Sequence, residues 1–441
     1  MDLIEQRIIN VIDKNRDTIL DFAHDIYNHA ELGYKEFRTA DKFKQVMQQL
    51  HLRTEDGLAL TGVKGYLKEG NYDITLALLG ELDALRIPTH EHTNPETEAA
   101  HCCGHHAQLA GVIGAAFALT DTEVTKTLDG QVVFFAVPAE EYGEIAFKNE
   151  LKDQGKIRYG GGKSELIRIG AFDDIDLSIA HHTGGKGITV GSGTGNGFVS
   201  KVIRYIGREA HAAVAPEKGI NALNAASLGL SALAYQRETF RDEDVVRVHP
   251  IITKGGNLVN VVPNEVIIET LVRAKTVEAI EDTDKKTTRA FKAGATAIGA
   301  GYVIDTMPGY LPTIGDEAHP DLVAAAELAA PEITVSKADT AKHSGGSTDL
   351  GDLQHIQPVL QFNTAGYEGD FHTNKFDIVD DNLAYITTAK IFALSAYRLL
   401  RNHAEQAKVI KDNYKPKYSK EQYLSYMESK IKREEGNIAN D

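Results

Sequence analysis

QVVFFAVPAEE, residues 131–141, is an apolar run that ends at two carboxylates, and its composition predicts a buried strand. The segment before it, QLAGVIGAAFAL (108–119), has the small and apolar residues of a packed helix. A second short strand, LSIAHH (177–182), ends at two histidines. Strands that alternate with helices are typical of an α/β domain with a largely parallel sheet. Such sheets bind ligands beyond the carboxyl ends of their strands, which is where these carboxylates and histidines stand.

The same alternation extends on both sides of this centre. Two helical stretches come first, and two apolar runs follow them; they cover residues 4–22, 37–50, 63–67 and 74–79. Near the other end of the chain the pattern predicts a helix, a strand and a long helix at residues 322–330, 358–362 and 382–401. We therefore predict one α/β domain with a mainly parallel sheet, built from residues 1–194 and 307–402.

A second unit interrupts this domain after the glycine-rich segment 184–197. Its pattern is strand, helix, strand, strand, helix and strand, at residues 198–206, 220–235, 245–252, 266–275, 276–298 and 302–306. That order is the ferredoxin-like α+β unit. We predict an inserted domain at residues 195–306. The charged, helix-prone composition of residues 403–441 predicts a helical C-terminal extension.

Charge and hydropathy narrow the classes of function. The 441 residues include 47 Lys and Arg against 63 Asp and Glu, a net charge of −16, which repels nucleic-acid backbones and anionic lipid. No apolar run approaches the eighteen or so residues of a membrane span, and the start of the chain is acidic and amphipathic. We expect a cytoplasmic protein that binds neither nucleic acid nor membrane.

Both cysteines of the chain lie in AAHCCGHHAQLAG (99–111). A structural disulfide is not expected in a reducing compartment, and a bridge between the neighbours Cys102 and Cys103 is strained. Their spacing also differs from the C-x-x-C redox motif. Two interpretations stay open from the residues alone, a packed thiol or a metal ligand.

Further metal-ligating side chains stand where strands or turns end. They are Cys103, His105, Glu140, Glu141, His181, His182 and His372. Singly, each is explained as a solvated or hydrogen-bonding residue. Together, thiolate, imidazole and carboxylate groups suit a transition metal such as zinc or manganese rather than calcium or magnesium. Of two adjacent carboxylates, one can bind metal while the other acts as a general base.

Ten motifs follow one another along the chain. They are HAELGYKEF (29–37), GELDALRIP (80–88), AHCCGHHAQLAG (100–111), VPAEEYGE (137–144), IAHHTG (179–184), GREAHAAVAPEKGINALNAA (207–226), GGNLVNVVPNEV (255–266), MPGYLP (307–312), HSGGSTDLGD (343–352) and GDFHT (369–373). This order resembles the di-metal amidohydrolases of the aminoacylase and carboxypeptidase superfamily. The most similar branch holds aminobenzoyl-glutamate hydrolase, hippurate hydrolase and the auxin-conjugate hydrolases. The resemblance runs from about residue 29 to 400.

The resemblance implies two divalent transition-metal ions, zinc or manganese, with cobalt or nickel as further options. Cys103 takes the place of the ligand that bridges them. By position, His105 and His182 are implied to bind one ion, and Glu141 and His372 the other.

Two further roles follow from the same resemblance. Glu140 matches the general base, and Asp83 matches an aspartate that orients a metal ligand. Many relatives carry a histidine two residues before that aspartate, where this chain has Glu81, so we do not predict Glu81 as a ligand.

Three positions leave alternatives open. His106 and Cys102 stand where the most similar relatives usually carry Asp or Asn and alanine, and they are either packing variants or residues that alter metal choice. Between His181 and His182 we predict His182 as the ligand.

The inserted domain supplies the predicted substrate contacts. The resemblance implies that His211 stabilises an oxyanion from the partner subunit of a homodimer formed through residues 195–306. Asn260 and Arg273 are implied to contact a substrate carboxylate, since a guanidinium donates two parallel hydrogen bonds to a carboxylate. Gly346, in GGSTD (345–349), lets the backbone approach the substrate or forms an ordinary turn.

We predict a metal-dependent amidohydrolase that cleaves N-acyl or aroyl amino acids. The alternatives are a dipeptidase or carboxypeptidase on the same scaffold and, in a different class, a metal-containing protein that only binds its ligand. Retention of a general base beside a metal ligand favours the enzymes.

Overall fold

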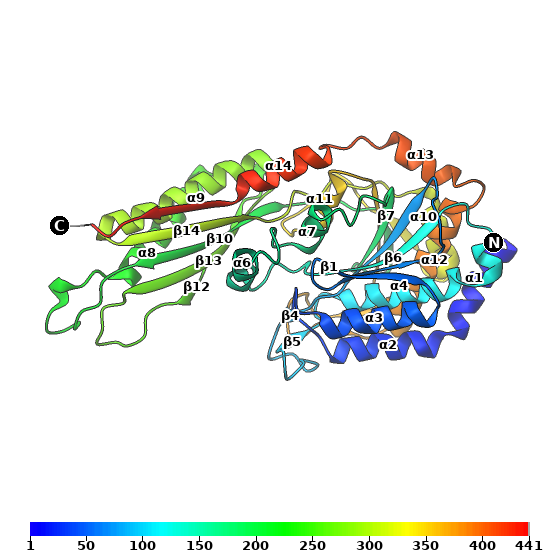
Figure 1. Cartoon of the computed structure of the whole chain (residues 1–441), viewed down its shortest axis with the longest axis horizontal. Coiled ribbons are helices and arrows are strands. Elements are labelled where there is room, and N and C mark those ends of the chain that lie inside the picture. The colour runs from blue at the N-terminus through cyan, green and yellow to red at the C-terminus, as the bar shows by residue number, and fades with distance from the viewer. Residues whose placement is uncertain (440–441) are drawn as a thin grey trace.

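The main domain is built on an eight-stranded sheet whose central strands are parallel (Figure 1). The computed structural model describes residues 1–439. The strand order is β1-β2-β6-β3-β7-β17-β8-β15. The bounds are β1 (Arg53–Leu58), β2 (Gly62–Tyr66), β3 (Thr75–Glu81), β6 (Gln131–Val137), β7 (Leu177–Thr183), β8 (Ile188–Val190), β15 (Val335–Lys337) and β17 (Val359–Thr364).

Helices cover both faces of this sheet, which explains why β6 is apolar throughout: a strand buried on both faces needs no polar side. One layer contains α1 (Leu3–Lys14), α2 (Arg16–Asn28), α3 (Phe37–Gln49), α4 (His105–Leu119), α10 (Pro320–Ala329) and α12 (Thr388–Leu400). The other contains α6 (Ile145–Asp153), α7 (Gly162–Arg168), α11 (Leu350–Gln354) and α14 (Lys420–Lys430). Shorter elements are α5 (Thr122–Thr125), β4 (Leu85–Arg86), β5 (Ala99–Ala100), β9 (Thr194–Gly195), β16 (His343–Ser344), β18 (Tyr367–Glu368), β19 (Asp377–Ile378) and a π-helical turn (Asn382–Thr387).

The register of the parallel strands brings the polar strand ends together. Glu81, the last residue of β3, pairs with Val137 of β6, and Leu79 pairs with Ala180 of β7. The segments that follow β3, β6 and β7 therefore leave the sheet at the same edge, where α4 begins.

The inserted domain is an antiparallel sheet with two helices on one face (Figure 1). Its bounds are β10 (Gly197–Ile206), α8 (Ala222–Gln236), β11 (Arg247–Val248), β12 (Ile251–Lys254), β13 (Glu265–Ala274), α9 (Val277–Ile298) and β14 (Gly301–Pro308). Burial alternates along β13, as expected where one face packs on helices. The predicted fold class, α/β with an inserted ferredoxin-like domain, is confirmed; the domain boundaries stay a proposal.

One predicted strand is divided in the structure. Residues 245–252 were expected to form a single strand, but they contribute to two, β11 and β12. Pro250 lies between them, and a proline has no amide hydrogen to donate to a strand ladder.

The C-terminal extension contains an element that its composition did not indicate. Helices α13 (Glu405–Asn413) and α14 are followed by a strand, β20 (Lys432–Gly436), which pairs antiparallel with β14. Figure 1 shows this segment crossing from the main domain to the inserted domain and lying along its sheet. The extension therefore joins both domains and covers one edge of the inserted sheet.

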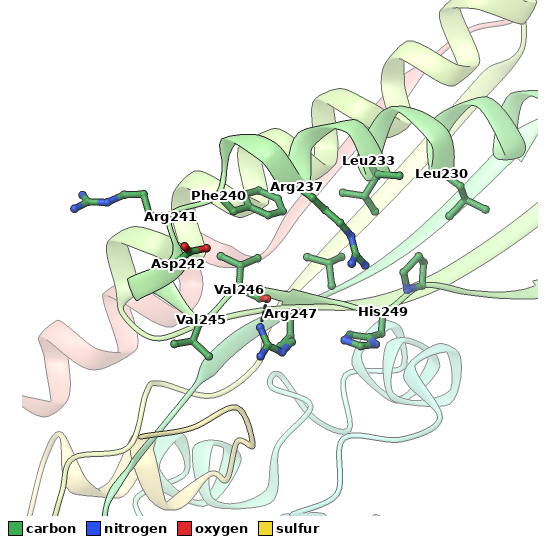
Figure 2. Close-up of a pocket in the computed structure, with 13 residues that line it drawn as sticks. Leu230, Leu233, Arg237, Phe240, Arg241, Asp242, Val245, Val246, Arg247 and His249 are labelled. Carbon is green, nitrogen blue, oxygen red and sulfur yellow. Dashed lines mark hydrogen bonds between the residues drawn. The ribbon is translucent and has the colours of Figure 1, made fainter. Parts of the chain in front are cut away.

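A groove of about 480 Å³ lies on the inserted domain between α8 and β11 (Figure 2). Arg237, Arg247 and His249 line it together with apolar residues such as Phe240. No predicted site residue lies in its wall. The predicted metal-ligating residues lie instead at the sheet edge of the main domain. None of the helices within residues 1–439 combines the length and the apolar character that crossing a membrane requires.

Candidate metal centre

Cys103 is the centre of the cluster at this sheet edge. Its Sγ lies 3.4 Å from His182 Nε2 and 3.3 Å from His372 Nε2. His372 Nε2 is in turn 3.2 Å from Glu141 Oε1. Two sets of donor atoms therefore meet at this thiol, and the atoms of each set lie close enough to share one ion. The first set is Cys103, His105 and His182; the second is Cys103, Glu141 and His372.

Gly104 explains how the thiol reaches the end of β7. This residue has φ +85°, and a Cβ built on it would lie 2.4 Å from Thr183 Oγ1. Any other residue would therefore be strained and would clash. On the opposite side, the backbone N–H of His372 donates to the Cys102 carbonyl oxygen at 3.0 Å, which ties the 369–373 loop to the cysteine segment.

His105 is oriented from behind by Asp83. Its Nδ1 lies 2.9 Å from the Asp83 carbonyl oxygen and 3.3 Å from Oδ1 of the same residue. Asp83 Oδ2 also accepts the backbone N–H of Glu141 at 2.8 Å. One buried aspartate thus holds a histidine and a glutamate of the cluster, as expected of a residue behind metal ligands.

Glu140 faces the same space. Its Oε2 is 3.9 Å from His105 Nε2, and Glu81 Oε2 is 3.1 Å from the same nitrogen. Glu81, His105 and Glu140 form a third group whose donor atoms lie close enough to share an ion. The structure thus brings Glu81, which was not predicted as a ligand, into the cluster.

The electrostatics are dominated by buried negative charge. Burial and the carboxylates of Glu81 and Glu141 raise the pKa of Glu140 well above its usual value. Burial alone would lower the pKa of His105, but Glu81 beside it raises that pKa instead. Burial and Glu141 raise the pKa of the Cys103 thiol. Divalent cations would offset this surplus of negative charge.

The residues present fit a transition metal. Two buried atoms of the cluster, His105 Nε2 and Glu141 Oε1, form no hydrogen bond of suitable geometry within residues 1–439, although an ionisable side chain lies 3.1 Å from the first and 3.2 Å from the second. Buried polar atoms normally have a partner, so their orientation toward a common space indicates a ligand. Nitrogen, sulfur and oxygen donors together are the set that zinc and manganese accept.

The structure places the three residues whose roles were left open, His181, His106 and Cys102, outside the cysteine-containing donor groups. His181 lies on the opposite side of β7 from the cluster, where its Nε2 is 2.7 Å from Thr364 Oγ1. His106 Nε2 lies 3.1 Å from Tyr385 Oη, and its ring packs against Tyr27. Both histidines therefore pack inside the main domain. Cys102 is also buried, and it belongs to neither cysteine-containing donor group.

A cavity of about 670 Å³ opens over the cluster. Cys103, Glu140, Glu141, His182 and His372 line it on the main-domain side. Arg273 of β13 and Gly346, two of the residues predicted to contact substrate, also line it. Arg273 forms no salt bridge to any residue in the described part of the chain, so its guanidinium is available to an anionic group in the cavity.

His211 and Asn260 are not brought to this cavity. They lie together at the tip of the inserted domain, where His211 pairs with Val261 and the N–H of Ala212 donates to the Asn260 carbonyl. Neither lines the cavity of its own chain. A contribution from them requires a second subunit.

Sequence reasoning missed three residues that each hold one of the glutamates of the cluster, Glu140, Glu141 and Glu81. The Tyr310 hydroxyl donates to the Glu140 carbonyl oxygen, and Lys148 Nζ donates to that of Glu141 at 2.8 Å. Lys163, fully buried, binds Glu81. Tyr310 stands in the motif MPGYLP (307–312), which was the available signal; the two lysines are in segments with no recognisable pattern.

The comparisons with known proteins agree with this geometry. The sequence profile of peptidase family M20/M25/M40 matches residues 77–394. The chain belongs to this family. Membership makes it a metal-dependent amidohydrolase or peptidase, and the resemblance read from the motifs is confirmed.

Two curated relatives and one solved structure show the range of this family. A mouse Xaa-Arg dipeptidase is 24% identical, over 96% of this chain and 95% of the relative. An Arabidopsis thaliana IAA-amino acid hydrolase is 26% identical, over 68% of this chain and 67% of its own. A dinuclear metal-binding M20 peptidase from Bacillus subtilis has a TM-score of 0.58 and 22% identity, with 88% of this chain and 99% of that one covered. The likeness to the M20 structure shows a shared fold.

Proposed function

We propose that this M20 enzyme hydrolyses the amide bond of N-acyl or aroyl amino acids, with Glu140 as general base. The observation that carries the proposal is the arrangement of one cavity: the Glu140 carboxylate and the metal-binding cluster lie on one wall, and the Arg273 guanidinium lies on the other. An amide with a free carboxylate fits between them.

The proposed ligands are Cys103 shared between two ions, His105 and His182 for one, and Glu141 and His372 for the other. Ions bound there would polarise the amide carbonyl and acidify a water molecule. We propose zinc or manganese, with cobalt or nickel as alternatives, because the donor set suits all of them.

Glu140 performs the proton transfers in this proposal. Its carboxylate takes a proton from the attacking water and delivers it to the amide nitrogen as that nitrogen leaves as an amine. The Tyr310 hydroxyl and Lys148 fix the backbone of the two glutamates, so the carboxylate of Glu140 stays in the cavity while Glu141 points to the cluster.

Arg273 is the proposed carboxylate contact. The ring centroid of Phe198 lies 5.5 Å from the guanidinium carbon of Arg273, and both residues line the cavity. Gly346 also lines the cavity, and its carbonyl oxygen accepts a hydrogen bond from the backbone N–H of Asn196 at 2.8 Å. A planar guanidinium held this way binds the carboxylate of an amino acid in two parallel hydrogen bonds.

The second candidate is a dipeptidase or carboxypeptidase, favoured by the mouse dipeptidase as a relative. A panel of N-acyl amino acids, their C-terminal amides and dipeptides, assayed before and after chelation, separates the two. Our proposal expects chelator-sensitive hydrolysis of the N-acyl amino acids and loss of turnover for the C-terminal amides. Faster hydrolysis of dipeptides would replace the proposal by the second candidate, and binding of both classes without turnover would indicate a binding protein.

Substitution Arg273→Gln is expected to raise KM for an N-acyl amino acid about 10-fold or more while kcat changes less, because a charge-assisted hydrogen bond to the carboxylate is lost. The measurement is steady-state kinetics on one substrate of the panel. The matched control is Arg247→Gln. Arg247 is the cross-strand neighbour of Arg273 but lies outside the cavity, so this substitution should leave KM unchanged. Equal KM values for the parent and Arg273→Gln would contradict the assignment.

We also propose a homodimer formed through the inserted domain, in which His211 and Asn260 reach the partner's cavity. Of the outer strands within residues 195–306, β14 is covered by β20, whereas β11 and β12 each pair with β13 alone and have no strand of residues 1–439 on their other side. Exposed apolar residues gather there and on α8: Leu228, Tyr235, Ile251 and Ile252. A cytoplasmic location is proposed as well, since Cys103 must stay reduced to bind metal.

Mixed dimers test the shared site. Glu140→Gln and His211→Ala are each expected to be nearly inactive, while dimers formed from both carry one intact site. Random mixing should then restore about a quarter of the parent activity, because half of the dimers are mixed and each has one working site. Activity that does not rise on mixing would contradict the shared site, and a monomer by sedimentation would contradict the dimer.

A further inference from the structure

Three charged side chains lie inside the main domain next to the metal centre: Glu81, Lys163 and Asp349, which are 6%, 0% and 0% exposed. Lys163 Nζ donates to Glu81 Oε1 at 2.6 Å and to Asp349 Oδ1 at 2.5 Å. The backbone N–H of Lys163 donates to Asp349 Oδ2 at 2.8 Å. We call these residues the Lys163 cluster.

One side of this cluster faces the metal centre. Gln108 Nε2 donates to Glu81 Oε2 at 2.8 Å, and the Glu81 backbone N–H donates back to Gln108 Oε1 at 3.0 Å. The same Oε2 atom is 3.1 Å from His105 Nε2. Lys163 and Gln108 thus hold one oxygen each of Glu81, which fixes its carboxylate beside a proposed metal ligand.

The other side faces the substrate cavity. Asp349 ends the segment 343–349 and immediately precedes α11. Most of this segment lines the cavity, including Ser344, Gly346 and Thr348. Because Lys163 binds Asp349 through two donors, a shift of the segment is passed to the ammonium group, and from there to Glu81 and His105.

Stability alone does not account for this arrangement. The surrounding face of the sheet is apolar, with Leu79, Leu166 and Leu350 buried nearby. Well-packed apolar residues in place of a buried ion pair are often as stable or more stable, because the desolvation of each ion is avoided. Three buried charges placed between the proposed ligands and the substrate segment therefore point to a positioning role.

We propose that Lys163 is a positioning residue that couples segment 343–349 to His105 through Asp349 and Glu81, so that metal affinity and substrate placement depend on each other. This inference rests on the proposed function. Residues behind metal ligands typically change metal affinity or activity by roughly 10–100-fold when removed, and we expect that range here.

The first variant is Lys163→Met, with Lys201→Met as its matched control. Lys201 is equally buried and pairs with Asp284 at 2.6 Å, but it lies in the inserted domain outside the cavity. Both variants lose a buried ion pair and should unfold at a lower temperature. Only Lys163→Met should bind zinc or manganese more weakly in competition with a chelator, by about 10-fold or more, with a raised KM for the substrate.

A second variant, Lys163→Met combined with Asp349→Asn, keeps the net charge and leaves an acceptor for the backbone N–H of residue 163. It should regain thermal stability without regaining metal affinity or KM. Metal affinity and KM that recover in parallel with thermal stability, or that stay within twofold of the parent in Lys163→Met, would overturn the proposal. Metal affinity is measured without substrate, so failure of the proposed amide hydrolysis is distinguished from failure of this inference.

Discussion

Glu140→Gln is expected to lower kcat by about 10²- to 10⁴-fold, the usual contribution of a general base, and to leave substrate affinity nearly unchanged. The amide of glutamine fills the same space but cannot accept the proton of the attacking water. The measurement is kcat from steady-state kinetics, together with the dissociation constant of a bound substrate. Metal content should stay at the parent value, because Glu140 lies in neither cysteine-containing donor group, whereas Glu141 lies in one of them.

Glu144→Gln is a suitable control for Glu140→Gln. Glu144 lies four residues away, pairs with Lys35 at the surface and is not in the cavity wall. It should have the parent kcat. A Glu140→Gln enzyme with kcat within a few-fold of the parent would remove Glu140 from the mechanism, and loss of metal in this variant would mean that the residue is a ligand.

Cys103→Ala is expected to abolish the stabilisation that zinc or manganese gives to the parent protein, and to reduce turnover by about two orders of magnitude or more. The thiol is shared by both donor groups, so its removal weakens both sites at once. Ligand binding stabilises a folded protein by about 2.7 kcal/mol at 100 times Kd, which thermal unfolding with and without metal detects.

The neighbouring thiol provides the control for this experiment. Cys102→Ala removes a sulfur that is also buried but belongs to neither cysteine-containing donor group. It should keep both the metal-dependent shift in unfolding temperature and the turnover. If the two alanine variants respond to metal alike, Cys103 is a packed thiol and not a ligand.

The central strands were predictable because their residues are apolar throughout and end in polar groups. The predicted strands QVVFFAVPAEE (131–141) and LSIAHH (177–182) correspond to β6 and β7, although β6 ends at Val137, four residues earlier than predicted. Part of the cluster followed from topology, because parallel strands of one sheet end at the same edge and Glu141 and His182 follow or end such strands. The meeting of these residues with Cys103 was implied by the family resemblance.

Other features depend on contacts that no local pattern contains. β20 is a charged segment whose strand conformation comes from the β14 edge that it covers, and propensity gives no sign of this pairing. The Lys163 cluster joins residues 81, 163 and 349, which are far apart in sequence. The predicted helix at 382–401 begins with a π-helical turn, at Asn382–Thr387, a detail set by packing against α4.

His181 and His182 could not be assigned their roles from the local sequence alone. Both residues lie in the same strand, and side chains alternate between its faces, so one had to face the cluster and the other the core. The contacts in the folded chain show which is which: His182 Nε2 lies 3.4 Å from Cys103 Sγ, whereas His181 Nε2 lies 2.7 Å from Thr364 Oγ1 of β17.

The most direct test of the central claim is the metal-to-chain ratio of the purified protein after loading with zinc or manganese, measured together with hydrolysis of an N-acyl amino acid before and after chelation. We predict about two ions per chain and turnover that is lost on chelation and regained on reloading. A protein that cannot be loaded, or whose turnover is indifferent to the chelator, would contradict the account of Cys103 as the centre of a metal-dependent active site.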